Sequence, residues 1–144
     1  MIKTLIDAGP IIALFDKSDF YHESVTDFFK NYTGILFTSW PVITEVSHML
    51  DFNVSVQIDL LTWLSRGAIT IINLEPDHLN RIIELCRKYS DVPMDLADSS
   101  LMVISEITGI NKIITLDSDY YIYRTKSKTA LMNVFEKYLA RKST

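Results

Sequence analysis

One stretch organises this chain: Val92-Pro93-Met94-Asp95-Leu96-Ala97-Asp98-Ser99-Ser100-Leu101-Met102-Val103. Pro93 and the polar residues around Leu96 predict the start of a helix, and Gly109 predicts its end. Between these points a set of residues recurs at helical spacing, which predicts that the segment is a helix. The residues of this set are Leu96, Ser100, Val103, Ile104 and Ile107.

The first turn of the predicted helix carries two carboxylates. Asp95 and Asp98 are three residues apart, so they project from one face, close to the positive end of the helix dipole, which favours their ionised forms. In isolation such a pair is usually an N-cap followed by a solvated acid. Whether the pair is only a helix cap or part of a functional site therefore depends on which other residues lie near it.

Length and composition favour one packed domain. The chain has 144 residues, of which 48% are hydrophobic and 22% charged, so we expect residues 1–144 to form a single domain. No apolar run approaches the roughly 20 residues that span a bilayer, and Asp7 interrupts the opening apolar run, which argues against a signal peptide. We therefore expect a cytoplasmic protein without a membrane partner. The single cysteine, Cys86, lies in an apolar series and predicts a buried thiol, not a disulfide or a cysteine metal site.

Charge is unevenly distributed along the chain. The net charge is −4, yet residues 123–144 hold six basic residues against one acid, Glu136. The six basic residues are Arg124, Lys126, Lys128, Lys137, Arg141 and Lys142. A basic tail beside an acidic body is compatible with contacts to a phosphate backbone, and equally with an ordinary solvated terminus.

Short apolar runs alternate with helical segments. Strands are predicted at residues 2–6, 34–38, 68–72 and 112–116. Residues 130–135 form either a last edge strand or the start of a helix through Leu139, which the pattern does not separate. This alternation predicts an α/β fold, with a central parallel sheet of four to five strands between two layers of helices and with right-handed crossovers.

Acids follow two of the predicted strands. Asp7 and Asp117 stand at carboxyl ends of strands, where ligands bind in open parallel sheets. Helix N-termini reach the same edge, so Asp95 and Asp98 are expected beside them, and Glu45 can approach from its own helix. Carboxylates that converge without matching Lys or Arg repel one another, and a divalent cation would relieve that repulsion.

The available ligand types indicate which cation and which chemistry to expect. Carboxylate oxygens without cysteine or paired histidine favour Mg²⁺ or Mn²⁺ over zinc, and His22, His48 and His78 are scattered without a metal-binding spacing. The sequence has no P-loop and no G-x-G-x-x-G motif. A magnesium ion held by a few carboxylates can position a water for in-line phosphoryl displacement, so a phosphodiester is the expected substrate.

Four short motifs follow one another along the chain: Leu5-Ile6-Asp7-Ala8-Gly9-Pro10, Thr44-Glu45-Val46, Met94-Asp95-Leu96-Ala97-Asp98-Ser99-Ser100 and Ile114-Thr115-Leu116-Asp117-Ser118-Asp119-Tyr120. In this order and spacing they resemble the motifs of the PIN domain family, and most closely those of its VapC-like toxin ribonucleases of bacteria. The resemblance covers about residues 2–124 and leaves the conformation of residues 125–144 without an expectation. One departure is that Ser99 replaces the alanine that commonly follows the third acid of the family.

The resemblance implies roles for individual residues. The catalytic, metal-binding acids of the family fall on Asp7, Glu45, Asp98 and Asp117. Asp95 and Asp119 are acids that often accompany this quartet, and Thr115 is the hydroxyl of the T-x-D motif, so these three are expected next to the ligands. The basic residues Arg124, Lys126 and Lys128 are the candidates for contacts with the RNA backbone.

The resemblance also implies an α/β/α sandwich, RNA cleavage dependent on Mg²⁺ or Mn²⁺, frequent homodimers and inhibition by a small antitoxin protein. Two related alternatives stay open: a housekeeping PIN nuclease without an antitoxin, and a catalytically silent PIN module that binds RNA or protein. A signalling receiver or phosphatase-like domain with Asp7 as phosphate acceptor is disfavoured, because it needs a late-strand lysine where this chain has Asp117.

Overall fold

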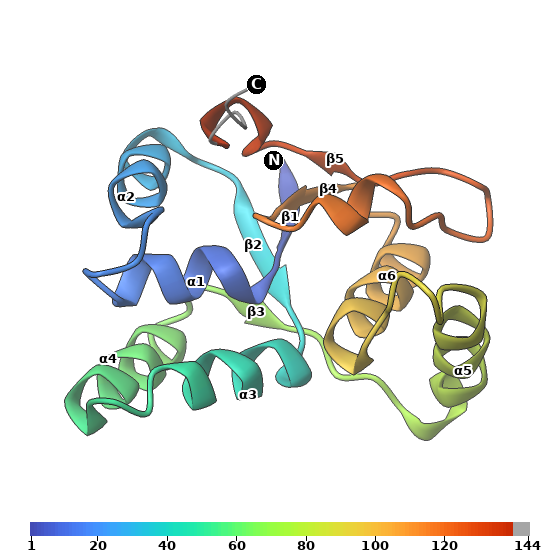
Figure 1. Cartoon of the computed structure of the whole chain (residues 1–144), viewed down its shortest axis with the longest axis horizontal. Coiled ribbons are helices and arrows are strands. Elements are labelled where there is room, and N and C mark those ends of the chain that lie inside the picture. Colours follow the sequence, from blue (N-terminus) through green and yellow to red (C-terminus); the bar gives the residue numbers. More distant parts are fainter. Residues whose placement is uncertain (140–144) are drawn as a thin grey trace.

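A computed structural model describes residues 1–139 and shows five parallel strands in the order β3-β2-β1-β4-β5 (Figure 1). The strands are β1 (Lys3–Ile6), β2 (Ile35–Thr38), β3 (Thr70–Ile71), β4 (Lys112–Ile114) and β5 (Met132–Asn133). Helices flank the sheet on both sides, so the predicted α/β/α sandwich is confirmed.

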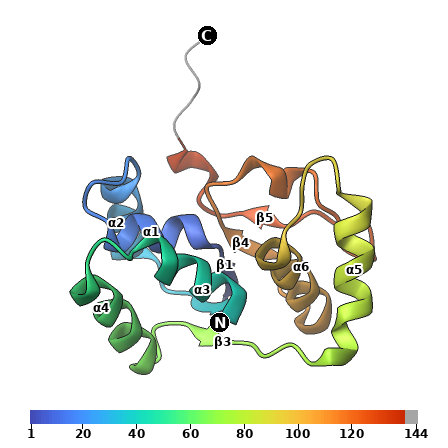
Figure 2. The ribbon, with the colours of Figure 1, turned by 60° about the horizontal axis from the view of Figure 1, so that its bottom comes forward.

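The helices form two groups. They are α1 (Ala8–Phe15), α2 (His22–Asn31), α3 (Trp40–Met49), α4 (Val54–Ser65), α5 (Leu79–Lys88) and α6 (Leu96–Thr108), with short 3₁₀ turns η1 (Pro76–His78), η2 (Ser118–Tyr121) and η3 (Glu136–Tyr138). In Figure 1, α1 to α4 occupy the left and the bottom of the view, and α5 and α6 lie at the lower right. Figure 2 shows the same separation from a second direction. None of the helices within residues 1–139 has the length and apolar character needed to cross a membrane.

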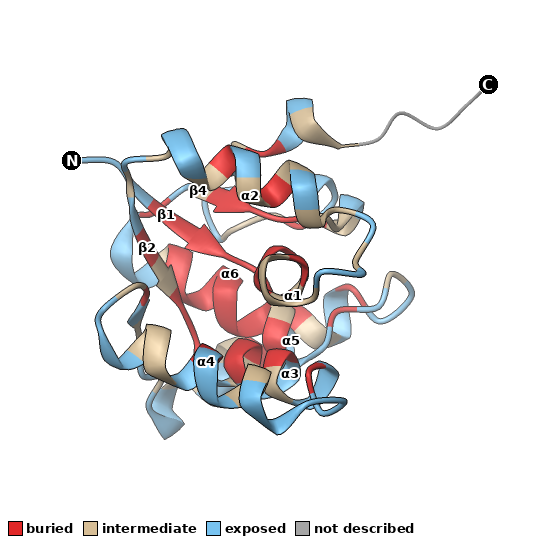
Figure 3. Ribbon diagram, turned by 90° about the vertical axis from the view of Figure 1, so that its left-hand side faces the viewer, coloured by how far each residue is buried: buried red, intermediate tan, exposed pale blue. Residues whose placement is uncertain are grey.

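β1 lies at the centre of the sheet, between β2 and β4. Its register pairs Leu5 with Phe37 on one side and with Ile113 on the other, and both Leu5 and Ile6 are fully buried (Figure 3). A strand covered on both faces requires a continuous apolar sequence, which explains the run that begins the chain. As a result, the chain leaves the middle of the sheet at Asp7.

A side-chain cap and a strand pairing define two further segments of the fold. α1 begins at Ala8 because the Asp7 side chain caps it, with the Ala8 N–H donating to Asp7 Oδ1 at 2.8 Å. The open alternative at residues 130–135 is resolved as an edge strand, since β5 pairs in parallel with β4 before the turn η3. The basic residues Arg141 and Lys142 of the predicted tail lie outside the described residues.

The helix predicted before Gly109 is present as α6, but the residues that recur at helical spacing do not mark its buried face at either end. Leu96 and Ile107 are 54% and 51% exposed, whereas Ala97 and residues 99–105 are buried. α6 packs against both α3 and α5, so its buried face is broader than a single stripe and includes serines. These serines bond within the fold; for example, the Ser100 hydroxyl donates to the Ala97 carbonyl at 2.6 Å. Cys86 is half-buried against the core rather than fully buried.

Candidate active site

A hollow of about 280 Å³ opens at the carboxyl ends of β1 and β4. It is lined by Asp7, Ala8, Gly9, Glu45, Asp95, Asp98, Leu116 and Asp117. Five of these side chains are carboxylates, and no Lys, Arg or His of residues 1–139 lines the hollow. The acids come from four segments far apart in the sequence, as expected for acids at the ends of strands and in the first turns of helices that reach the same edge of the sheet.

Asp7 is the most buried acid of the hollow, with 7% of its surface exposed. Its Oδ1 accepts the Ala8 N–H, and its Oδ2 accepts the Thr115 hydroxyl at 2.9 Å. Burial raises the pKa of Asp7 to about 6; the two hydrogen bonds oppose this rise, and the nearby charges of Asp117 and Glu45 add to it. Asp7 is therefore a carboxylate held in one orientation, in surroundings that disfavour its charge.

Thr115 connects Asp7 with the segment that carries Asp117. Its hydroxyl donates to Asp7 and accepts the Asp117 N–H at 2.9 Å. The Thr115 backbone is itself held by the buried side chain of Asn133 on β5, whose Nδ2 donates to the Thr115 carbonyl at 3.0 Å and whose Oδ1 accepts the Thr115 N–H at 3.3 Å. Asn133 was not among the predicted site residues, although one amide inside the apolar run of residues 131–135 was a detectable signal.

Asp95 and Asp98 form a capping box at the start of α6. The Asp98 N–H donates to Asp95 Oδ1 at 2.8 Å, and the Asp95 N–H donates to Asp98 Oδ2 at 3.4 Å, so Asp95 is the N-cap. Asp98 also faces the hollow. Burial, followed by the charges of Asp7 and Asp95, raises the pKa of Asp98 to about 8. Asp98 thus occupies an ordinary first-turn position, but burial and the neighbouring acids make ionisation of its carboxyl group unfavourable.

Three acids of the predicted quartet meet closely enough to share one cation. Asp7, Asp98 and Asp117 each offer a carboxylate oxygen within 4.8 Å of the others. Three hard oxygen donors, at least two with raised pKa values and with no cation among the lining residues, fit a divalent ion such as Mg²⁺ or Mn²⁺. Glu45 lines the same hollow from α3, and desolvation, with the charges of Asp95 and Asp117, raises its pKa as well.

The helices that carry Glu45 and Asp98 are joined at their starts. The Ser39 hydroxyl caps α3 and lies 2.6 Å from the Ser100 hydroxyl of α6, and both residues are buried. This contact brings the first turns of the two helices to the same edge of the sheet. Asp119 lies outside the lining of the hollow; its backbone N–H donates to Asp117 Oδ1 at 2.9 Å.

Two buried tyrosines, which the sequence analysis did not single out, also reach this site. The Tyr120 hydroxyl donates to Asp98 Oδ1 at 3.3 Å, and the Tyr123 hydroxyl lies 3.4 Å from Asp98 Oδ2. Both follow Asp117 closely in the sequence, but nothing local indicates that their hydroxyl groups turn toward α6.

The predicted basic residues do not line the acidic hollow. The Arg124 guanidinium donates to the backbone carbonyls of Tyr121 and Tyr123. Lys126 lies near the other end of α6 from Asp98, where its backbone N–H donates to Glu106 Oε2 at 2.7 Å. Lys128 is exposed on the same loop, so these residues do not form one patch with the acids.

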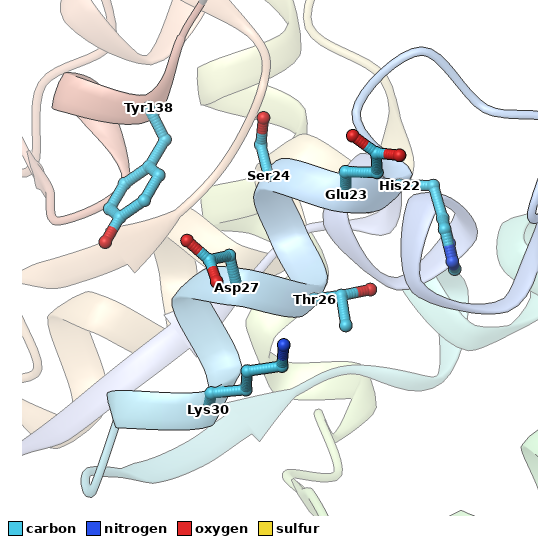
Figure 4. Close-up of a pocket in the computed structure, with 7 residues that line it drawn as sticks. All are labelled: His22, Glu23, Ser24, Thr26, Asp27, Lys30 and Tyr138. Atoms are coloured by element: carbon cyan, nitrogen blue, oxygen red, sulfur yellow. The ribbon is translucent and has the colours of Figure 1, made fainter.

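None of the three histidines lines the acidic hollow, and a larger hollow lies elsewhere. His22 bonds the Ala13 carbonyl, His78 accepts the Glu75 N–H, and His48 is exposed. A larger hollow of about 480 Å³ lies over α2 near Tyr138 (Figure 4). Its lining holds none of the predicted site residues.

Comparisons with known proteins find similarity to the PIN domain and to VapC proteins. The family model of the PIN domain matches residues 4–126. Ribonuclease VapC26 of Mycobacterium tuberculosis is 24% identical over 119 residues, covering 81% of this chain and 88% of that protein. The crystal structure of VapC20 from Mycobacterium tuberculosis, described as a sarcin-ricin loop cleaving toxin, superposes with a TM-score of 0.75 at 13% identity and covers 83% of this chain and 93% of that one. At that identity the superposition shows a shared fold.

Proposed function

Since this chain belongs to the PIN domain family, we propose that it is a divalent-metal-dependent endoribonuclease of the VapC type, which hydrolyses RNA phosphodiester bonds. The observation that carries the proposal is the convergence of Asp7, Asp98 and Asp117 within 4.8 Å in a hollow that no Lys, Arg or His side chain of the described residues lines. The ribonuclease name of the VapC26 relative supports RNA as the substrate.

We propose the remaining properties on the same basis. Residues 1–144 form one PIN nuclease domain, which acts in the cytoplasm as a homodimer and is neutralised by a small antitoxin protein. The VapC relatives support this toxin assignment, because VapC20 is described as a toxin.

Different residues at the hollow are proposed to bind the ion and to position its ligands. Asp7, Asp98 and Asp117 would hold Mg²⁺ or Mn²⁺, with Glu45 completing the quartet. The ion, when bound, positions a water and stabilises the negative charge that develops on the phosphate. Thr115 holds Asp7 in place, and the capping box with Asp95 holds Asp98. Glu45 comes from a different helix, α3, and is the exposed member of the quartet; as the fourth carboxylate it would add to the negative charge that holds the ion.

Cleavage assays test this proposal. The purified protein is incubated with structured RNAs in EDTA, in Mg²⁺ and in Mn²⁺, together with Asp7→Asn and with Asp59→Asn as a control acid exposed on α4. We expect cleavage only with added metal, normal activity for Asp59→Asn and a loss of about 100-fold or more for Asp7→Asn. Cleavage that persists unchanged in EDTA would overturn the proposal.

A further inference from the structure

We propose that Tyr120 is a positioning residue, assisted by Tyr123, which holds the Asp98 carboxylate in the orientation needed to bind the divalent cation. This inference rests on the proposed function, because it concerns how one member of the acidic triad is presented to the ion. It assigns a role to a side chain that neither lines the hollow nor offers a carboxylate.

Tyr120 has a hydroxyl group that only Asp98 satisfies. The residue belongs to the turn η2, and its side chain is 2% exposed. Within residues 1–139, the one hydrogen bond of this hydroxyl is its donation to Asp98 Oδ1 at 3.3 Å. A buried hydroxyl without a partner is costly, so the position of Tyr120 and the orientation of the Asp98 carboxylate depend on each other.

Tyr123 approaches the other oxygen of the same carboxylate. Its hydroxyl donates to the Pro93 carbonyl at 3.0 Å and lies 3.4 Å from Asp98 Oδ2. A tyrosine has one hydroxyl hydrogen, so the shorter contact with Pro93 takes the larger share of the donation. Tyr120 is therefore the main donor to Asp98, and Tyr123 a secondary one.

The rings hold both hydroxyl groups in place. Tyr120 and Tyr123 pack edge to face with their ring centroids 5.2 Å apart, and Tyr89 packs on Tyr123 at 5.1 Å. All three rings are buried, at 2%, 0% and 6% exposure respectively. A donor fixed in this way restricts rotation of the Asp98 carboxylate.

The turn η2 connects two acids of the site: Asp117 precedes it, and Tyr120 within it donates to Asp98. Asp117 caps η2, and Tyr120 is the third residue of that turn. The Asp119 N–H of this turn holds Asp117, and the Tyr120 hydroxyl holds Asp98, so η2 positions both acids together. Outer groups that orient a metal ligand typically contribute 10–100-fold to metal affinity, which gives the scale of the expected effect.

Titration calorimetry with Mn²⁺ tests the inference on three proteins: the parent, Tyr120→Phe and Tyr89→Phe. Tyr89 is the matched control, because it belongs to the same cluster of rings but its hydroxyl does not contact Asp98. That hydroxyl accepts the backbone N–H of Arg124 instead. We expect Tyr120→Phe to raise the Kd for Mn²⁺ by roughly 10-fold or more. Tyr89→Phe should leave the Kd unchanged. Thermal melts in EDTA verify that each variant is folded.

A double-mutant cycle with Asp98→Asn shows through which residue Tyr120 acts. In the Asp98→Asn protein, adding Tyr120→Phe should weaken the remaining Mn²⁺ binding no further. Equal Kd values for the parent and Tyr120→Phe, or equal losses for Tyr120→Phe and Tyr89→Phe, would overturn the inference alone. A parent protein that binds no Mn²⁺ would overturn the proposed function itself. If Tyr120→Phe fails to fold, Tyr123→Phe replaces it, with a smaller rise in Kd expected and an unchanged Kd counting against the inference.

Discussion

At the scale of single residues, Asp98 links stability to pH. Its pKa is raised from an ordinary 3.8 to about 8 by burial and then by the charges of Asp7 and Asp95. A carboxyl whose pKa is higher in the folded state favours folding most at low pH, and this contribution is lost as pH rises toward the folded pKa. Without metal, we therefore expect the melting temperature to rise as pH is lowered from about 8 to 6. Thermal melts in EDTA across this range measure it, and a flat or opposite dependence would contradict it.

Replacing Asp98 by asparagine removes the cost of either burying a charged carboxylate or taking up a proton on folding. In EDTA at neutral pH, Asp98→Asn should melt higher than the parent; because water screens the half-exposed carboxylate, the expected gain is about 1 kcal/mol in the free energy of unfolding. The parent should gain more from added Mn²⁺, since it retains the ligand. Melts of both proteins with EDTA and with Mn²⁺ test this. A variant that melts lower in EDTA and responds to Mn²⁺ like the parent would identify Asp98 as a structural cap only.

The acids of the site should differ in their effect on the rate. Asp7→Asn, Glu45→Gln, Asp98→Asn and Asp117→Asn should each reduce RNA cleavage by about 100-fold or more, because each removes a proposed ligand. Asp95→Asn and Asp119→Asn should cost less, roughly 10–100-fold, because neither acid is a proposed ligand: Asp95 caps the helix that carries Asp98, and Asp119 adjoins Asp117. Single-turnover rates with saturating Mn²⁺ compare the six variants, and equal losses at all six would contradict the division.

At the scale of elements, β5 supports the site through Asn133. Its amide satisfies both the N–H and the carbonyl of Thr115, whose hydroxyl holds Asp7. Asn133→Ala leaves these buried backbone groups without partners, so we expect a loss of about 2 kcal/mol in the free energy of unfolding and weaker Mn²⁺ binding. Urea unfolding and Mn²⁺ titration measure the two effects.

A neighbouring residue of the same strand provides the control for Asn133. Met132 is 59% exposed, so Met132→Ala should change neither the stability nor the metal affinity appreciably. A variant Asn133→Ala as stable as Met132→Ala would show that β5 does not hold the end of β4.

At the scale of the whole molecule, an acidic protein must bind a polyanion. The net charge is −4, and Arg124, Lys126 and Lys128 lie outside the acidic hollow. We expect their triple alanine variant to bind RNA more weakly regardless of sequence and to show a flatter dependence on salt, by roughly 0.7–0.9 in the log–log slope for each phosphate that the protein no longer neutralises. RNA binding measured over a salt series gives this slope.

The control changes charge equally but elsewhere. Alanine at the exposed residues Lys17, Arg66 and Arg87 removes the same three positive charges. An unchanged slope in the first variant, or an equal change in both, would mean that the loop around Lys126 has no specific part in holding RNA.

Much of this protein is determined by local features of its sequence. The apolar run before Asp7 predicts a central strand, Asp95 and Gly109 mark the ends of α6, and acids at strand ends predict where the site lies. These inferences succeed because caps, glycine conformations and strand burial depend on residues near one another in the chain. The family resemblance then points to the four acids, of which the structure brings Asp7, Asp98 and Asp117 within 4.8 Å.

Only the tertiary structure decided which side chains surround those acids. Leu96 and Ile107 have the spacing of core residues yet are exposed, because the partners of α6 set its buried face. The hydrogen bond from Tyr120 to Asp98 joins residues 22 positions apart, and the contacts between Asn133 and Thr115 span 18. Such contacts depend on how strands and helices pack rather than on local preference, so no periodicity or cap signal encodes them. The sequence by itself therefore determined the carboxylates and their edge of the sheet, and the packing of distant segments decided how each carboxylate is held.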